Sequence, residues 1–75
     1  MTHPGKIAFY DAGQAEPTKI VAAETVPDSI KFIQTESGLI PVVKIVSFLA
    51  EDRRIIRQYG PDDQLLNSTV QFLNP

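Results

Sequence analysis

The three arginines of this chain, Arg53, Arg54 and Arg57, fall within one short segment that ends at Tyr59. If residues 53–59 form a strand, alternation places Arg53, Arg57 and Tyr59 on one face and Arg54 on the other. Two guanidinium groups beside a phenol can recognise a carboxylate, a phosphate or the backbone of single-stranded nucleic acid. The simpler interpretation is a solvated sheet face whose charges pair loosely with nearby carboxylates and discourage aggregation.

Carboxylates gather at two points, Glu51-Asp52 and Asp62-Asp63. A hard cation such as calcium takes oxygen ligands of this kind. However, the predicted strand between the two pairs is seven residues long and would separate them by roughly 20 Å. The chain has no cysteine, and its one histidine, His3, lies beside the N-terminus, so the usual Cys/His zinc ligand set is missing. We therefore expect no metal site and no cofactor.

No arrangement of residues selects a catalytic centre. The sequence has no cysteine nucleophile, no serine in a nucleophile elbow and no glycine-rich phosphate loop. Nothing in the spacing of its carboxylates singles out an acid–base pair. We expect a protein that is not an enzyme.

Length and composition predict one small domain over residues 1–75, in which residues 1–5 form a flexible lead-in. The formal charge of -2 argues against a general nucleic-acid binder, because such proteins usually carry a marked basic excess. No apolar run is long enough to span a bilayer, and the first residues do not read as a signal peptide. We expect a cytoplasmic protein with no membrane partner.

The first half of the chain predicts three strands. Residues 6–10 form a short strand candidate with Ile7 and Phe9 on one face. Residues 29–36 alternate apolar and polar side chains, and Ser37-Gly38 suits a two-residue hairpin connection. Residues 18–26 are ambiguous: their apolar residues alternate as in a strand, but Pro17 could also begin a short helix. We favour the strand.

The second half contains three apolar-rich runs, at residues 39–50, 53–59 and 64–73, with only turn-forming residues between them. Short connections favour antiparallel neighbours. Gly60-Pro61-Asp62-Asp63 fits a type I turn, and a helix over residues 47–59 is the alternative to the two strands there. The predicted fold is all-β or predominantly β: an antiparallel meander sheet or small barrel of about five or six strands.

Residues 39–50 are apolar on both faces of the predicted strand. One face would carry Ile40, Val42, Val46 and Phe48, and the other Leu39, Val43, Ile45 and Leu49. A strand of this kind lies in the centre of a sheet or at an interface, and a chain this short has little remaining sequence with which to cover both faces.

These features lead to two functional hypotheses. The first is a small non-catalytic protein–protein interaction or regulatory module that binds a protein partner or a second copy of itself. Its contact surface would be made by Val43, Ile45, Leu49, Arg53, Arg57 and Tyr59. The alternative is a small β-barrel that binds nucleic acid or another anionic ligand through Lys44, Arg53, Arg54, Arg57 and Tyr59.

Overall fold

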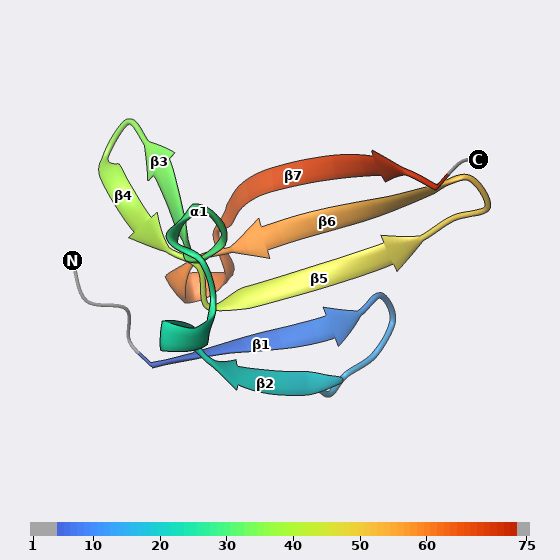
Figure 1. The fold of residues 1–75 in the computed structure, drawn as a ribbon, viewed down its shortest axis with the longest axis horizontal. Helices are drawn as coiled ribbons and strands as arrows, with labels where there is room; N and C mark the ends of the chain where they lie inside the picture. The colour runs from blue at the N-terminus through green and yellow to red at the C-terminus, as the bar shows by residue number, and fades with distance from the viewer. Residues whose placement is uncertain (1–4, 74–75) are drawn as a thin grey trace.

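The computed structural model of the chain describes residues 5–73, and its fold is a five-stranded sheet with a separate two-stranded hairpin (Figure 1). The lead-in and His3 therefore lie largely outside the described residues. The sheet has the strand order β2-β1-β5-β6-β7, and the hairpin pairs β3 with β4. The strands are β1 (Lys6–Asp11), β2 (Lys19–Ala22), β3 (Phe32–Thr35), β4 (Gly38–Pro41), β5 (Lys44–Leu49), β6 (Arg53–Tyr59) and β7 (Leu65–Phe72). Three short helical turns accompany them: η1 (Ala23–Thr25), α1 (Asp28–Lys31) and η2 (Pro61–Asp63).

The predominantly β fold predicted from the sequence is confirmed, but the sheet is neither wholly antiparallel nor a barrel. β1 runs parallel to β5, while every other neighbouring pair is antiparallel. The long connection between β1 and β5 makes this possible, because it contains β2, the turns η1 and α1, and the β3–β4 hairpin before the chain returns to the sheet. β2 and β7 are not paired with each other, so the sheet remains open.

Two predicted strands of the first half are shorter than expected because helical turns take part of each. Within residues 18–26, the strand β2 ends at Ala22 and the 3₁₀ turn η1 follows. Within residues 29–36, α1 precedes β3, and the Pro27 carbonyl accepts hydrogen bonds from the amides of Ile30 and Lys31. A proline fits before a helical turn because the missing N–H would have no partner there.

The predicted hairpin between β3 and β4 is present, one residue earlier than expected. Its two connecting residues are Glu36 and Ser37, and Gly38 already pairs with Thr35. Gly38 has a φ of 106°, a left-handed conformation that glycine adopts without steric cost.

The prediction of one strand over residues 39–50 is wrong, since the chain leaves the hairpin after Pro41 and enters the five-stranded sheet at Lys44. Val42, between them, is fully buried. The double-sided apolarity therefore arises because the segment serves two sheets and supplies a core residue at the crossing. The alternative helix over residues 47–59 is excluded, because β5 and β6 occupy that segment.

The hairpin of β6 and β7 is confirmed, although its turn is not of type I. Asp62 and Asp63 both have positive φ values, 64° and 58°, as type I′ turns require at their two central positions. Aspartate tolerates this conformation better than most residues do. A register shift at Gln58/Tyr59 marks a bulge where the hairpin begins.

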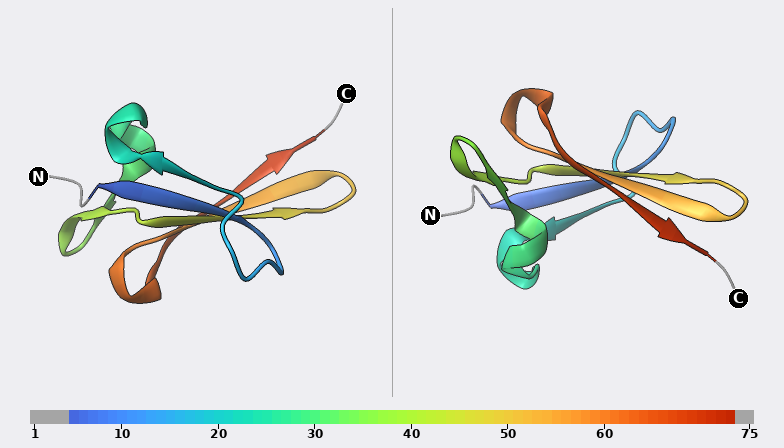
Figure 2. Two further views of the ribbon diagram at one scale, coloured as in Figure 1. Left: turned by 90° about the horizontal axis from the view of Figure 1, so that it is seen from below. Right: turned by 90° about the horizontal axis from the view of Figure 1, so that it is seen from above.

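The core is small and lies on one side of the sheet, where η1 and α1 sit in both views of Figure 2. Four apolar residues of the described chain are buried: Ile7, Ala23, Val42 and Ile45. Partly buried apolar side chains pack against them, namely Phe9, Val21, Val26, Ile33, Ile56 and Leu66.

The cross-strand register divides the sheet into two faces. We call the side beneath α1 the groove face; its central members are Phe9, Ile45, Ser47, Arg54, Ile56, Gln58, Asn67 and Thr69. We call the other side the open face; its members include Tyr10, Lys44, Val46, Phe48, Arg53, Ile55, Arg57, Tyr59, Val70 and Phe72. No helix of the described chain lies over the middle of the open face (Figure 2).

Candidate functional site

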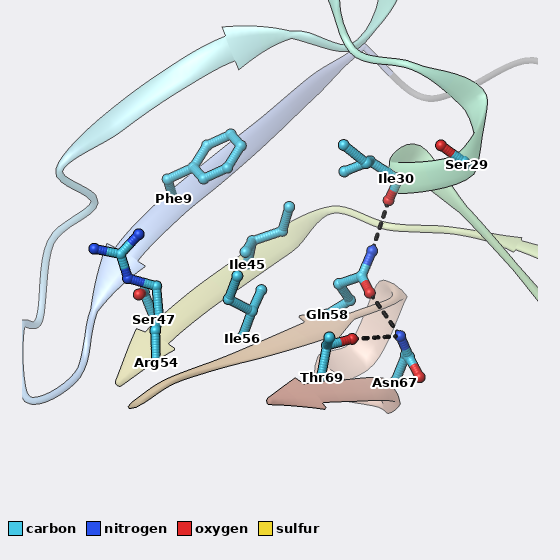
Figure 3. Close-up of a pocket in the computed structure, with 10 residues that line it drawn as sticks. All are labelled: Phe9, Ser29, Ile30, Ile45, Ser47, Arg54, Ile56, Gln58, Asn67 and Thr69. Carbon is cyan, nitrogen blue, oxygen red and sulfur yellow. Dashed lines mark hydrogen bonds between the residues drawn. The ribbon is translucent and has the colours of Figure 1, made fainter. Parts of the chain in front are cut away.

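Two surfaces of the domain offer candidate sites, and the first is a groove of about 490 Å³ between α1 and the groove face (Figure 3). The groove takes Ser29 and Ile30 from α1, and its other lining residues come from β1, β5, β6 and β7. Its walls are mostly apolar, and Arg54 is the one charged residue among the described residues that line it. Since this described lining includes no carboxylate, histidine, cysteine or lysine, it offers no side chain suited to general-base catalysis.

Three of the polar side chains in this groove, Gln58, Asn67 and Thr69, belong to one hydrogen-bonded network. The Gln58 Nε2 donates a hydrogen bond of 2.8 Å to the Ile30 carbonyl, and its Oε1 accepts one of 2.9 Å from Asn67 Nδ2 (Figure 3). Asn67 Nδ2 also donates to Thr69 Oγ1 at 3.3 Å. Within the described chain no buried side-chain nitrogen or oxygen lacks a partner. Gln58, itself buried, thus ties α1 to the sheet.

The second surface is the open face, where three cationic side chains stack on aromatic rings. Lys44 Nζ lies 4.9 Å from the ring centroid of Tyr59 and 5.6 Å from that of Tyr10. The same ammonium donates a 2.8 Å hydrogen bond to Asp63 Oδ1 in the turn after β6. This hydrogen bond raises the pKa of Lys44 above its ordinary value, against a smaller opposing effect of burial.

At the far end of the open face, Arg53 combines an aromatic contact with an ion pair. Its guanidinium carbon lies 5.5 Å from the Phe72 ring centroid. Its Nε and Nη2 donate to the two oxygens of Asp52 at 3.0 and 3.2 Å. These hydrogen bonds lower the pKa of the Asp52 carboxyl and raise the pKa of the Arg53 guanidinium. Both groups are exposed, so solvent weakens the pair.

Arg57 lies between these two cations and differs from them. Its guanidinium carbon is 4.7 Å from the centroid of the Phe48 ring. Unlike Lys44 and Arg53, it forms no ion pair with a carboxylate of residues 5–73. The register makes Val46 its direct cross-strand neighbour and Phe48 its diagonal one. A stacked guanidinium therefore presents donors among apolar side chains on an uncovered face.

The charge of the open face contrasts with the acidic balance of the whole chain. The one acidic residue within a described strand is Asp11, and its register partner Ser47 places it on the groove face. The other acidic side chains lie in turns, connecting segments and α1. Asp52 and Asp63 border the open face at opposite ends, so its centre is positively charged and its ends are mixed.

The structure separates the residues that the sequence grouped. Lys44, Arg53, Arg57 and Tyr59 share the open face, whereas Arg54 lines the groove on the other side. The predicted apolar surface is divided differently. Val43 is half-buried at the entry to β5, Ile45 is 5% exposed within the core, and Leu49 is 69% exposed at the end of β5.

Sequence reasoning grouped Tyr59 with Lys44, but it missed the other aromatic partners of the three cations, Tyr10, Phe48 and Phe72. Alternation did place Phe48 on one face with Val46, and the hairpin register could have placed Phe72 near Arg53. Tyr10 could not be assigned, because its neighbour Val46 lies across the parallel β1–β5 ladder, which no local pattern indicates.

Other kinds of site find no support in the described residues. No group of three or more His, Cys, Asp or Glu side chains among residues 5–73 is placed to hold a metal ion. None of the helices in that same range has the length and apolarity needed to cross a membrane. Comparison of the chain with protein-family models, curated proteins and solved structures yields no match.

Proposed function

We propose that the domain is a non-catalytic protein-binding module and that the open face is its contact surface. The observation that carries this proposal is the position of Arg57. Its guanidinium is stacked on Phe48 in the middle of an uncovered sheet face and pairs with no carboxylate of the described chain. A protein partner would supply that carboxylate.

The side chains of the open face resemble those of protein interfaces in kind and arrangement. Tyrosine, phenylalanine and arginine are enriched at interfaces, and binding hot spots tend to lie near the centre of a contact surface. Here Val46, Ile55 and the Arg57–Phe48 stack form the centre. The ion pairs of Lys44 and Arg53 lie towards the ends, as the polar rim of an interface does.

The small size of the core also supports the proposal that the domain binds a partner. Only four apolar residues of the described chain are buried, while Leu65 and Phe72 remain more than half exposed. A domain of this size buries a smaller fraction of its surface than a larger one does and is correspondingly marginal. Burial of open-face side chains against a partner would add to the stability of the fold.

The chemistry of Arg57 defines the partner. An arginine and a carboxylate can form a bidentate pair of two parallel hydrogen bonds. The attraction within such a pair is stronger where apolar neighbours exclude water. We therefore infer a partner surface on which an aspartate or glutamate is surrounded by apolar side chains.

Single-stranded nucleic acid is the second candidate, because aromatic rings and cations together on an open sheet can stack bases and contact phosphates. Two observations favour protein instead. Tyr59, Phe48 and Phe72 each already carry a cation of the same chain over the ring. In addition, Asp52 and Asp63 would repel phosphates at both ends of the face.

A displayed library of short peptides tests the proposal against many candidate partner sequences at once. We expect the wild-type domain to enrich peptides that combine an acidic residue with apolar or aromatic ones. For those peptides, Arg57→Gln should weaken binding about tenfold or more, the scale of a lost charged hydrogen-bonded pair.

The matched control is Arg54→Gln, which removes the same charge from the groove face and should leave peptide binding unchanged. A parallel titration uses single-stranded RNA of mixed sequence at low salt. The proposal fails if enriched peptides bind equally well to Arg57→Gln, or if RNA binds with an Arg57 dependence and no peptide does.

A further inference from the structure

We propose that two copies of this chain associate through the free edge of β7, forming one continuous ten-stranded sheet. This inference rests on the edge strand and its backbone, independently of the partner proposed for the open face.

The two edges of the five-stranded sheet differ in how well they are protected. β2 has four residues, including Lys19. β7 has eight, with the sequence LLNSTVQF, and contains neither a charged residue nor a proline. All but one of its residues are exposed, with Val70 at 47% and Phe72 at 66%. Short length, charges and prolines are the usual means by which edge strands avoid pairing, and β7 has none of them.

The hydrogen-bond pattern between β6 and β7 shows which backbone N–H and C=O groups of β7 can pair with another strand. The Leu73 amide donates to the Asp52 carbonyl, so backbone groups of odd-numbered residues near the end of β7 point towards β6. By alternation, the N–H and C=O groups of Ser68, Val70 and Phe72 point outwards. Their side chains all belong to the open face.

These outward groups specify an antiparallel pairing centred on Val70. Val70 would lie opposite Val70 of the second copy, and Ser68 opposite Phe72 of the second copy. This register uses all three outward residues of each strand and forms about six backbone hydrogen bonds. It also brings Thr69 opposite Gln71 of the second copy, so polar side chains meet on the groove face.

A second copy fits this edge better than an unrelated strand does, because the arrangement is self-complementary. β7 carries no charge, so two copies can approach without like-charge repulsion. Antiparallel pairing about a two-fold axis perpendicular to the sheet keeps both open faces on the same side. The dimer would therefore display two Arg57 side chains on one surface.

Sedimentation and amide hydrogen exchange on the full chain test this proposal. We expect a concentration-dependent dimer in which the amides of Ser68, Val70 and Phe72 become protected as concentration rises. The outward amides of β2, at Ile20 and Ala22, should remain unprotected.

Two proline variants give a matched comparison. Val70→Pro removes an outward donor that β6 does not use, and we expect it to raise the dimer dissociation constant about tenfold or more. Ile20→Pro removes an outward donor from the opposite edge and should leave the dimer intact. Val70→Lys serves as a second variant should the proline disturb folding, because it places two ammonium groups opposite each other and should also separate the copies.

A wild-type chain that sediments as a monomer up to millimolar concentration would overturn the proposal. A dimer that survives in folded Val70→Lys, or one that Ile20→Pro disrupts instead, would also overturn it, because the contact would then lie elsewhere.

Discussion

The guanidinium carbon of Arg57 lies 4.7 Å from the centroid of the Phe48 ring. Phe48 is the diagonal neighbour of Arg57 across the antiparallel β5–β6 ladder, in which Val46 is the direct partner of Arg57. The stack fixes the arginine over the sheet while leaving its donors accessible to a partner. It also explains why a charged residue is tolerated beside apolar side chains in the middle of the open face, since the ring offers an attractive environment for the cation.

A double-mutant cycle measures this stack. Arg57→Gln and Phe48→Leu should each lower the free energy of unfolding slightly, and the two changes together should cost less than their sum. We expect a coupling energy of about 0.5 to 1 kcal/mol, the scale of an exposed cation–π contact. Urea unfolding supplies the four stabilities. A cycle of Arg54→Gln with Phe48→Leu is the control and should show no coupling, because Arg54 lies on the other face.

The attachment of α1 to the sheet depends on Gln58. Gln58→Leu removes the hydrogen bonds to the Ile30 carbonyl and from Asn67, and we expect a loss of about 1 to 3 kcal/mol in unfolding free energy. Amide hydrogen exchange in α1 should accelerate by more than the loss in global unfolding free energy explains. Gln71→Leu, at an exposed position on β7, should have little effect. Equal losses for the two variants would contradict the role given to Gln58.

The location of the core predicts an asymmetry between two isoleucines. Ile7 is fully buried and Ile20 is 57% exposed, although they lie on neighbouring strands. Ile7→Val should lower the unfolding free energy by about 0.5 to 1.5 kcal/mol. Ile20→Val should be close to neutral, because it leaves no buried cavity. Similar losses at both positions in thermal or urea unfolding would show that the core is placed wrongly.

The Asp52–Arg53 pair predicts a pH effect with a definite sign. The hydrogen bonds from Arg53 lower the Asp52 pKa below its ordinary value of 3.8. Whatever stability this adds is therefore present above pH 3.8 and is lost as the pH falls through the lowered pKa. Carboxyl-carbon NMR should give an Asp52 pKa below 3.8 in the wild type and a value near 3.8 in Arg53→Gln. A pKa unaffected by that substitution would exclude the pair in solution.

The features that the sequence predicted correctly are those that depend on local residue patterns. The alternation in residues 53–59 assigned Arg53, Arg57 and Tyr59 to one face and Arg54 to the other, and the register confirms this. The turn between β6 and β7 was located correctly, although its backbone type depends on two left-handed aspartates that the Pro-Asp pattern did not indicate.

The features that were missed depend on long-range contacts. The break at Val42 divides an apolar run between two sheets, and nothing local distinguishes that run from one long strand. The parallel pairing of β1 with β5 brings Tyr10 beside Val46, across a connection that contains most of the first half of the chain. The sequence also placed Ile45 on a contact surface. Its place in the core becomes visible only when η1 and α1 are packed on the sheet, and that packing is a long-range contact.

Methyl chemical-shift mapping tests the central claim, that the open face is the binding surface, most directly. The probe is the strongest acidic peptide selected by the wild-type domain, titrated into protein labelled at isoleucine and valine methyls. We predict that the shifts concentrate at Val46 and Ile55 on the open face, while Ile45 and Ile56 on the groove face move little. Shifts concentrated at Ile56 and Ile45 instead would place the binding site in the groove and contradict the account.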